Sequence, residues 1–445
     1  MANKKRKLAP GPGKKQKPGA DHDSEISFSS DEEAERKQLV LEDHADKETA
    51  TEKRTRMAND LMSKLAFLKK KTQDGEEEGE EDFARALRKQ VLQQDGRLVR
   101  KLATNLSIRF KTEPVEHSFH RSSHSQSVTS VALSQDESKC FSAGKDGSLV
   151  GWDLETNTSF WKASAGKTAL SLALSSDGQF LATAGDGNKI KIWDVREASA
   201  AQRPVKVLSG HKDLVSGLVF RHNSHTLLSS SADRCVQLWN VDEGSFIEQL
   251  FGHSAKITSV DCLSRERCIT ASEDLSVRLW KIPEESHLVL QGRHTAPIDC
   301  VKMLNESVFA SGSQEGSLAL WGASSKRPTS IVPDAHGPGN WLSAITAIRG
   351  SDVIATGSND GLIRVWAVNM DRLKINPDPI AALPCTGHIN ALAFGVSGTI
   401  LVAGGGQEPR MGRWRVNKEA KNGVHVFRLP ASSAAMAGDH ESDEE

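Results

Sequence analysis

Tryptophan recurs along the second two-thirds of the chain at nearly constant intervals, and this regularity limits the possible folds more than any other feature. The residues are Trp152, Trp193, Trp239, Trp280, Trp321 and Trp366, separated by 41, 46, 41, 41 and 45 positions. A Ser or Thr stands ten residues before each, and an Asp or Glu stands six residues before most. A period of about 40–45 residues with these positions predicts four-stranded sheets arranged as propeller blades.

Each repeat has the same internal order of turns and strands. In the third repeat a Gly-His turn at 208–211 precedes an alternating strand at 214–220, and two further strand-like segments follow at 226–233 and 236–240. The period-two alternation and the Gly and Asp turns predict short antiparallel strands.

The seventh repeat departs from this pattern. It begins with a Gly-His pair at 387–388, but Trp414 lies 48 residues after Trp366, and Gly404 replaces the expected hydroxyl residue. Trp414 therefore belongs either to the third strand of the last blade or to a loop.

Closure of the ring favours the loop. An outer strand must precede the first Gly-His turn, so we expect residues 115–121 to complete the last blade and remove both sheet edges. The third strand of that blade is then expected at 423–429, and residues 407–422 become an enlarged loop. The predicted fold is an all-β, seven-bladed propeller over residues 115–430.

Charge is segregated at both ends of the chain although the net charge is only −1. Residues 1–52 are largely polar and residues 431–445 are acidic, so both are expected to be disordered tails. Ser27, Ser29 and Ser30 precede acids and suit an acid-directed kinase. A basic cluster in the first tail is typical of a nuclear localisation signal or of an RNA-contacting tail, which are compatible interpretations. The cluster consists of Lys4, Lys5, Arg6, Lys7, Lys14, Lys15 and Lys17.

Residues 53–114 form a charged segment with helical periodicity. Apolar residues recur at intervals of three and four from Met57 to Leu68, and a second amphipathic pattern runs from Phe83 to Leu102. We expect these helices either to dock on the propeller or to form a partner-binding arm.

The recurrence of Ser or Thr, His and Asp argues against a catalytic triad. A catalytic group is needed once, whereas a structural relay from indole through hydroxyl and imidazole to carboxylate satisfies buried polar groups in every blade. In the third and fourth repeats we expect relays of His211, Ser229, Asp233 and Trp239 and of His253, Thr270, Asp274 and Trp280. The second repeat has Ala165-Gly166 in place of the histidine and a shifted Asp186, so its relay should be incomplete.

The sequence contains no motif for catalysis or cofactor binding. GxxxxGK[ST], HExxH and Cys/His metal spacings are absent, and the glycines of 404–408 have no lysine in P-loop register. We therefore expect no enzyme activity, metal, cofactor or small-molecule substrate. Six scattered cysteines without a CxxC pair, with no secretory signal and no long apolar run, predict an intracellular protein with reduced thiols and no membrane insertion.

Several stretches carry a more specific resemblance. Within the repeats they are LVSGLVFR (214–221), LWKIPEES (279–286), IDCV (298–301), LALWGASSKRP (318–328) and above all VAGGGQEPRMGRW (402–414). Before the repeats they are EKRTRMANDLMSKL (52–65) and FARALRKQVLQQDGRLVRKLA (83–103). With these stretches the chain resembles WD-repeat propellers associated with the U3 small nucleolar RNA (the U3-55K or Rrp-nine type, YAOZHE in plants).

This resemblance implies a nucleolar, non-enzymatic subunit of the U3 box C/D ribonucleoprotein, which acts in pre-rRNA processing within the small-subunit processome. It also implies recognition of the box B/C region of the RNA together with a small kink-turn-binding protein. The competing function is a protein-interaction scaffold, such as a chromatin or ubiquitin-ligase adaptor, because the same fold often serves that purpose.

Residues 407–422 are the candidate RNA contact that emerges from the residues themselves. Five bases oppose two acids there, and we expect the bases to meet phosphates while Gln407 and Trp414 shape the loop or meet a nucleobase. The alternative is a loop that only packs the blade, with Trp414 buried. The candidates are Gln407, Arg410, Arg413, Trp414, Arg415, Lys418 and Lys421. A second candidate surface consists of Lys212, Arg221 and Arg234.

Overall fold

The structure, a computed structural model, describes residues 99–120, 124–196, 203–292 and 294–429. The expectations for the basic cluster, for the serines at 27–30, for the helix from Met57, for most of the segment from Phe83 and for the acidic tail lie outside these residues.

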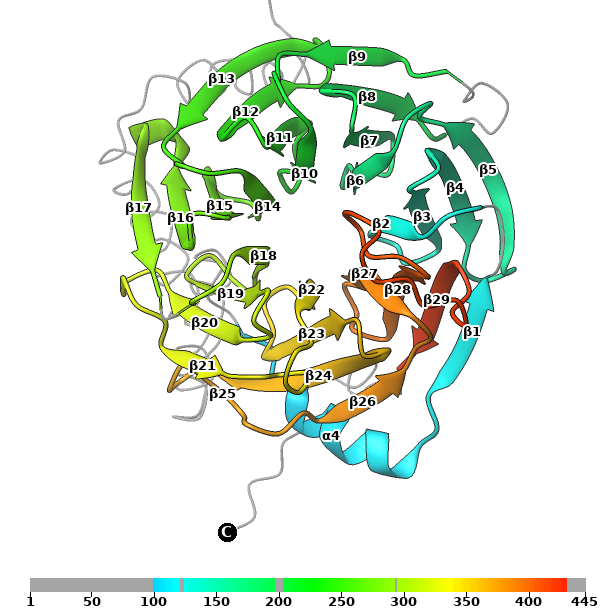
Figure 1. The fold of residues 1–445 in the computed structure, drawn as a ribbon, viewed down its shortest axis with the longest axis vertical. Helices are drawn as coiled ribbons and strands as arrows, with labels where there is room; N and C mark the ends of the chain where they lie inside the picture. The colour runs from blue at the N-terminus through cyan, green and yellow to red at the C-terminus, as the bar shows by residue number, and fades with distance from the viewer. Residues whose placement is uncertain (1–98, 121–123, 197–202, 293, 430–445) are drawn as a thin grey trace, which may run out of the picture. The chain divides into compact units, whose positions relative to one another are not determined.

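The described residues form seven antiparallel sheets arranged around a central axis, which confirms the predicted seven-bladed propeller (Figure 1). The first blade contains β2 (Val128–Leu133), β3 (Lys139–Gly144), β4 (Ser148–Asp153) and β5 (Thr158–Ser164). The second contains β6 (Ala169–Leu174), β7 (Phe180–Gly185), β8 (Lys189–Asp194) and β9 (Lys206–Ser209). The third contains β10 (Val215–Phe220), β11 (Thr226–Ser231), β12 (Cys235–Asn240) and β13 (Ser245–Phe251).

The remaining blades continue in the same order. The fourth contains β14 (Ile257–Cys262), β15 (Arg267–Ser272), β16 (Ser276–Lys281) and, after the 3-10 turn η1 (Ile282–Glu284), β17 (Ser286–Gln291). The fifth contains β18 (Ile298–Met303), β19 (Val308–Ser313), β20 (Leu318–Gly322) and β21 (Ser330–Val332). The sixth contains β22 (Leu342–Ala347), β23 (Val353–Ser358), β24 (Leu362–Asn369), β25 (Lys374–Ile375) and β26 (Ala381–Pro384). The last contains β27 (His388–Phe394), β28 (Ile400–Gly406), β29 (Gly423–Arg428) and β1 (Glu116–His120).

The last blade closes the ring with strands from both ends of the described chain. β1 pairs with β29 antiparallel, from Glu116 opposite Arg428 to His120 opposite Val424. This pairing confirms the expected closing strand and the expected third strand. It also settles the position of Trp414, which lies in the loop between β28 and β29.

The hydrophobic core lies between neighbouring blades. Ile190 and Ile192 of β8 belong to one buried cluster with Val215 and Leu218 of β10 in the next blade. Alternate residues of a strand point to opposite faces of its sheet, so the period-two pattern supplies apolar side chains to each neighbour. Burial of each such side chain contributes about 1.5–3 kcal/mol, which makes the blades mutually dependent.

A helix that precedes the first strand docks on the sixth blade. α4 (Ala103–Thr112) buries Ala103 and Leu106 in a cluster with residues of β23 and β24. The carboxylate of Asp352 accepts the backbone N–H groups of Leu102 and Ala103 at 2.8 and 3.0 Å, which satisfies donors that a helix start leaves unpaired. The helix therefore begins where the sequence pattern suggested that one would end, and it packs on the sixth blade.

The central channel of the propeller opens at two faces, which we call the loop face and the far face. The loop face carries residues 407–422 and the turns at 145–147, 211–214 and 232–234. The far face carries the turns that follow the innermost strands, at 134–138, 175–179, 221–225, 348–352 and 395–399.

Candidate nucleic-acid interface

The third blade contains the relay of buried hydrogen bonds that its sequence suggests. The Trp239 indole N–H donates to Ser229 Oγ at 2.9 Å, and Ser229 Oγ lies 2.7 Å from His211 Nε2. His211 Nδ1 lies 2.8 Å from Asp233 Oδ2, and this oxygen also accepts the Lys212 backbone N–H at 3.1 Å. The bonds join two strands to two turns and satisfy groups that would otherwise be buried without partners.

Similar relays recur in other blades. In the fourth blade Trp280 donates to Thr270 at 2.8 Å, Thr270 lies 2.7 Å from His253, and His253 lies 2.9 Å from Asp274. The corresponding sets in the first, fifth and sixth blades are His124, Ser142 and Trp152; His294, Ser311 and Trp321; and His336, Thr356 and Trp366. In the second blade Trp193 donates to Thr183 at 2.9 Å, and Ala165 occupies the place of the histidine.

The electrostatics of the relay match a fixed structural element. Burial acts to raise the pKa of Asp233, but the hydrogen bonds from His211 and backbone N–H groups outweigh it and leave that pKa lowered. Burial lowers the pKa of His253 and His294, which favours neutral imidazoles between hydroxyl and carboxylate. The same arrangement in several blades supports a stabilising role.

The last blade has no such relay. Phe427 takes the position of the relay tryptophan, and the spacing of the tryptophans did not reveal this replacement. In the third blade Leu227 lies opposite Trp239, and the equivalent Leu401 lies opposite Phe427. The position of Ser229 is taken by Ala403 in the same register. Both replacements are apolar, so this blade buries neither an indole N–H nor a hydroxyl at these positions.

The loop at 407–422 has a partly buried root and an exposed tip. We call residues 407–410 the root and residues 411–419 the tip. At the base, the backbone N–H of Gln407 donates to Asn422 Oδ1 at 3.0 Å, and Gln407 Nε2 donates to the carbonyl of residue 420 at 3.0 Å. Gln407 thus shapes the loop.

Side chains of the first and last blades hold the root in place. Lys145 Nζ lies 2.9 Å from Glu408 Oε2 and donates to the Gly412 carbonyl at 2.6 Å. Asn390 Nδ2 donates to the Glu408 carbonyl at 3.0 Å and to the Val128 carbonyl at 2.9 Å. These contacts position the loop before any ligand binds, which reduces the entropy lost on binding.

Arg410 points into the centre of the ring. Its Nε donates to the Leu170 carbonyl of β6 at 3.2 Å, and its Nη2 donates to the Ser216 carbonyl of β10. Burial lowers the pKa of Arg410, and the negative charge of Asp299 partly opposes that effect. Two of its nitrogens already bind backbone carbonyls, which distinguishes Arg410 from the exposed bases of the loop.

The tip presents its side chains to solvent. The Arg413 side chain is 65% exposed, with Nε 3.4 Å from Glu408 Oε2, and Trp414 is 68% exposed. Lys418 is exposed as well, and so is Lys421, which lies just after the tip. The alternative in which Trp414 is buried is therefore wrong.

A glycine supports the exposed tryptophan. Gly412 has φ +79°, and a Cβ at this position would lie only 1.6 Å from Trp414 Cζ3. The indole thus lies directly against the Gly412 backbone, where no other residue leaves space.

A second aromatic contact fixes Arg415. The Arg415 guanidinium lies 5.1 Å from the centroid of the Trp341 ring, within the range of a cation–π interaction. Trp341 in turn stacks on His388, with centroids 6.4 Å apart and planes 10° apart. Burial lowers the pKa of His388, and the Arg415 charge acts in the same direction.

A cavity of about 550 Å³ lies between the loop and the channel. Asp299, Gln314, Trp341, Arg410 and Trp414 contribute to its lining. Gln314 Nε2 donates to Asp299 Oδ1 at 2.9 Å, and burial raises the pKa of Asp299 to about 6. The exposed Trp414 indole thus lies at the edge of a cavity that also contains the Asp299 and Gln314 side chains.

The second candidate surface is divided by the structure. Lys212 and Arg234 are exposed on turns of the loop face, whereas Arg221 follows β10 at the far face. Arg221 also binds Glu266 Oε1 at 3.2 Å. The three bases therefore form no single surface, because a six-residue strand separates Lys212 from Arg221.

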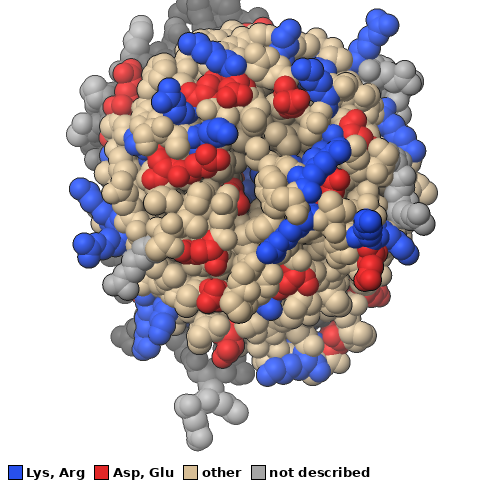
Figure 2. Space-filling view, in the orientation of Figure 1, with Lys and Arg blue, Asp and Glu red and all other residues tan. Residues whose placement is uncertain are grey.

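Lysine and arginine gather near the channel on the face shown in Figure 2. A diagonal band of basic side chains lies beside the centre, and acids and bases alternate around it. In Figure 1, in the same orientation, the orange-red segment between β28 and β29 reaches the centre of the ring.

The described part of the chain offers little for other chemistry. Within it, no group of three or more His, Cys, Asp or Glu side chains could hold a metal ion. All six cysteines are buried and free. No helix among the described residues has the length and apolar character needed to cross a membrane.

Comparisons with known proteins agree with the fold and identify the family. Five segments match the WD40 family (WD domain, G-beta repeat), at residues 116–153, 159–194, 202–240, 244–281 and 331–367. The U3 snoRNP-associated protein-like EMB2271 of Arabidopsis thaliana is 33% identical over 458 residues, with 94% of each chain covered. The chain belongs to the family of U3 snoRNP-associated WD-repeat proteins.

Other members of this WD-repeat family are equally informative. The U3 small nucleolar RNA-interacting protein 2 of Homo sapiens is 38% identical, with 87% of this chain and 84% of the human protein covered. The solved structure of U3-55K has 41% identity and a TM-score of 0.67, with 71% of this chain and 98% of that chain covered. The crystal structure of RRP9 WD40 repeats has 39% identity and a TM-score of 0.67, with 71% and 100% covered.

Proposed function

We propose that this chain is a non-catalytic RNA-binding and scaffold subunit of the U3 box C/D small nucleolar ribonucleoprotein. In this role it acts in pre-rRNA processing and small ribosomal subunit biogenesis, in the nucleus and nucleolus. Support comes from relatives whose names contain U3 and which match most of the chain. The observation that carries RNA contact is the pre-positioned loop with an exposed basic and aromatic tip.

The tip and root have different roles in this proposal. Arg413, Arg415 and Lys418 of the tip bind phosphates, together with Lys421 just after it, which supplies salt-dependent affinity. Trp414 stacks on an unpaired nucleobase, because its indole is exposed and supported from below. The root residues Gln407 and Arg410 hold the loop against the ring without touching RNA.

The propeller provides the scaffold for further partners. A kink-turn-binding protein and other box C/D ribonucleoprotein and processome proteins are the expected neighbours, with no membrane and no small-molecule substrate. Lys212 and Arg234, which share the loop face, extend the basic surface toward the RNA or such a partner.

Charge reversal in the tip tests this proposal. Arg413→Glu with Lys418→Glu should weaken binding to U3 RNA at least about tenfold and reduce the slope of log affinity against log salt by about 1–2. Lys162→Glu with Lys326→Glu is the matched control, because both lysines are exposed and lie in other blades. Circular dichroism and thermal melting establish that each variant is folded.

Crosslinking and sequencing of RNA bound in cells provides the decisive comparison. A single dominant small nucleolar RNA, lost in the tip variant and kept in the control, supports the proposal. Recovery of that RNA at wild-type levels by the folded tip variant would refute the loop assignment. Recovery of no dominant RNA by the wild-type chain would instead favour the adaptor function.

A further inference from the structure

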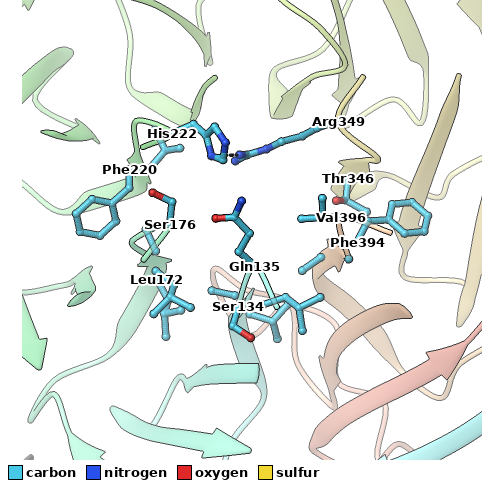
Figure 3. Close-up of a pocket in the computed structure, with 18 of the residues that line it drawn as sticks. Ser134, Gln135, Leu172, Ser176, Phe220, His222, Thr346, Arg349, Phe394 and Val396 are labelled. Carbon is cyan, nitrogen blue, oxygen red and sulfur yellow. Dashed lines mark hydrogen bonds between the residues drawn. The ribbon is translucent and has the colours of Figure 1, made fainter. Parts of the chain in front are cut away.

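The far face has a cavity of its own at the opposite end of the channel. Its volume is about 350 Å³, and its lining includes Gln135, His222, Lys302, Arg349 and Val396 (Figure 3). The lining includes several bases but, among the residues that the structure describes, no Asp or Glu. The cavity therefore has a positive potential that its own walls do not neutralise.

Most charged groups near this cavity already have partners. Lys302 Nζ lies 2.7 Å from Asp261 Oδ1. Arg221, which also lines the cavity, is paired with Glu266, and the Glu137 carboxylate accepts the Ser397 backbone N–H. One guanidinium that lines the cavity is not paired with any of these acids.

Arg349 is that guanidinium. It is exposed, and it forms no ion pair with a carboxylate of the described residues. Instead its Nη1 lies 3.3 Å from His222 Nδ1, which must accept this hydrogen bond from a neutral ring. Burial and the Arg349 charge lower the pKa of His222, which favours the neutral ring beside the guanidinium.

The donors converge on one space. Figure 3 shows His222 and Arg349 joined across the cavity mouth, with the Gln135 amide directed toward the same space. Arg100 approaches the same rim, because its Nη2 donates to the carbonyls of Arg349 and Val396 at 3.2 and 2.9 Å. A guanidinium with an amide donor beside it suits a carboxylate, which accepts charge-assisted hydrogen bonds.

The described part of the chain ends close to this cavity, and an acidic stretch follows it in the sequence. The Leu429 backbone N–H donates to the Thr399 carbonyl at 2.7 Å, and residues 395–399 contribute Val396 to the lining. Ten residues from position 430 to the first acid span up to roughly 33 Å when extended. The following acids, with no Lys or Arg among them, are Asp439, Glu441, Asp443, Glu444 and Glu445.

We propose that the far-face cavity binds the acidic stretch 439–445 of this same chain, with a carboxylate on the Arg349 guanidinium. Because only residues 430–438 separate the stretch from the last blade, its effective concentration is in the millimolar range, and even a weak contact is occupied. The contact covers the free basic cavity of the far face and leaves the loop face open. A competing acidic segment of a partner would have to displace it.

A labelled peptide of residues 437–445 tests recognition. The recipient is the full chain with the five acids of the stretch changed to amides, so that its own stretch does not compete. We expect saturable binding at sub-millimolar concentration at about 0.15 M salt, weakened about tenfold by Arg349→Gln. Lys162→Gln, an exposed base on β5, is the matched control and should leave binding unchanged.

A photo-crosslinking residue at Ser442 tests the contact within the unaltered chain. We expect attachment to residues 346–349 or 394–396, reduced by Arg349→Gln and by excess free peptide. Equal peptide binding with and without the Arg349 guanidinium would overturn the proposal, as would attachment elsewhere on the propeller. Tighter binding of a peptide of the acidic residues 74–82, without attachment from Ser442, would assign the cavity to that stretch instead.

Discussion

Replacement of Arg410 by methionine removes the guanidinium that anchors the loop root while keeping a long apolar side chain. The guanidinium donates to the carbonyls of Leu170 and Ser216 in the innermost strands of two blades. Hydrogen bonds to charged groups contribute about 1.5–3 kcal/mol each, and desolvation of the charge costs several kcal/mol. We take a net contribution to loop docking of about 2 kcal/mol, within the range of one such bond, which corresponds to about thirtyfold in the local opening equilibrium.

Hydrogen exchange measured by mass spectrometry reports this opening directly. In Arg410→Met, backbone amides of residues 407–422 should exchange about thirtyfold faster, while amides of the blades keep their wild-type protection. Arg413→Met is the matched control. Because the Arg413 side chain is 65% exposed, this substitution should leave hydrogen exchange of the root unchanged. It should reduce RNA affinity, because a phosphate contact is lost.

Two results would refute this reasoning. Unchanged exchange at 407–422 would mean that Lys145 and Asn390 hold the root without Arg410. A general loss of protection across the blades would mean that Arg410 supports the propeller itself and that root and tip are not separable.

Three further perturbations probe other parts of the molecule. Trp239→Phe removes the donor to Ser229 and should lower the free energy of unfolding by about 1–3 kcal/mol, whereas an unchanged urea midpoint would contradict a relay that stabilises the blade. Burial, reinforced by the charges of neighbouring histidines, lowers the pKa of His425 to about 4. The folded state therefore resists protonation of this ring, and the free energy of unfolding should fall by about 3 kcal/mol as the pH drops from 6.5 to 4. Urea titrations over this range should show a smaller dependence in His425→Leu, and equal slopes would argue against that assignment. Gly412→Ala must displace the Trp414 ring, so filter binding should show the RNA affinity of Trp414→Ala with an unchanged melting temperature, and wild-type affinity would disprove the stacking role.

The periodic features of the fold could be predicted from the sequence because each depends on local spacing. An indole and a hydroxyl ten residues apart lie on adjacent strands joined by a tight turn, so their contact follows from strand geometry. Closure by residues 115–121 followed from the need to satisfy two sheet edges. The placement of Lys212 and Arg221 on opposite faces could also have been predicted from the sequence, because a six-residue strand lies between them.

The orientation of the Arg410 side chain could not be predicted from the sequence. Its partners, Leu170 and Ser216, are about two hundred residues away in sequence, and they become accessible only when the inner strands of separate blades surround one channel. Net charge in a loop predicts affinity for phosphate only if each base remains in solvent. Arg413 satisfies this condition, and Arg410, three residues earlier, does not.

The long loop and the missing relay of the last blade have one physical cause. In the third blade Asp233 occupies the turn between β11 and β12, so the relay exists only if that turn is short enough to return a carboxylate to the histidine. In the last blade the equivalent turn is expanded into residues 407–422, and His388 lies in β27, where its Nδ1 has no hydrogen-bond partner among the described residues. An indole and a hydroxyl left in that blade would lose part of their network at a cost of about 1–3 kcal/mol each, and Phe427 and Ala403 avoid this cost by burying no polar group. Ring closure by β1 then stabilises the blade that lacks the relay, which leaves its turn free to carry the exposed tip.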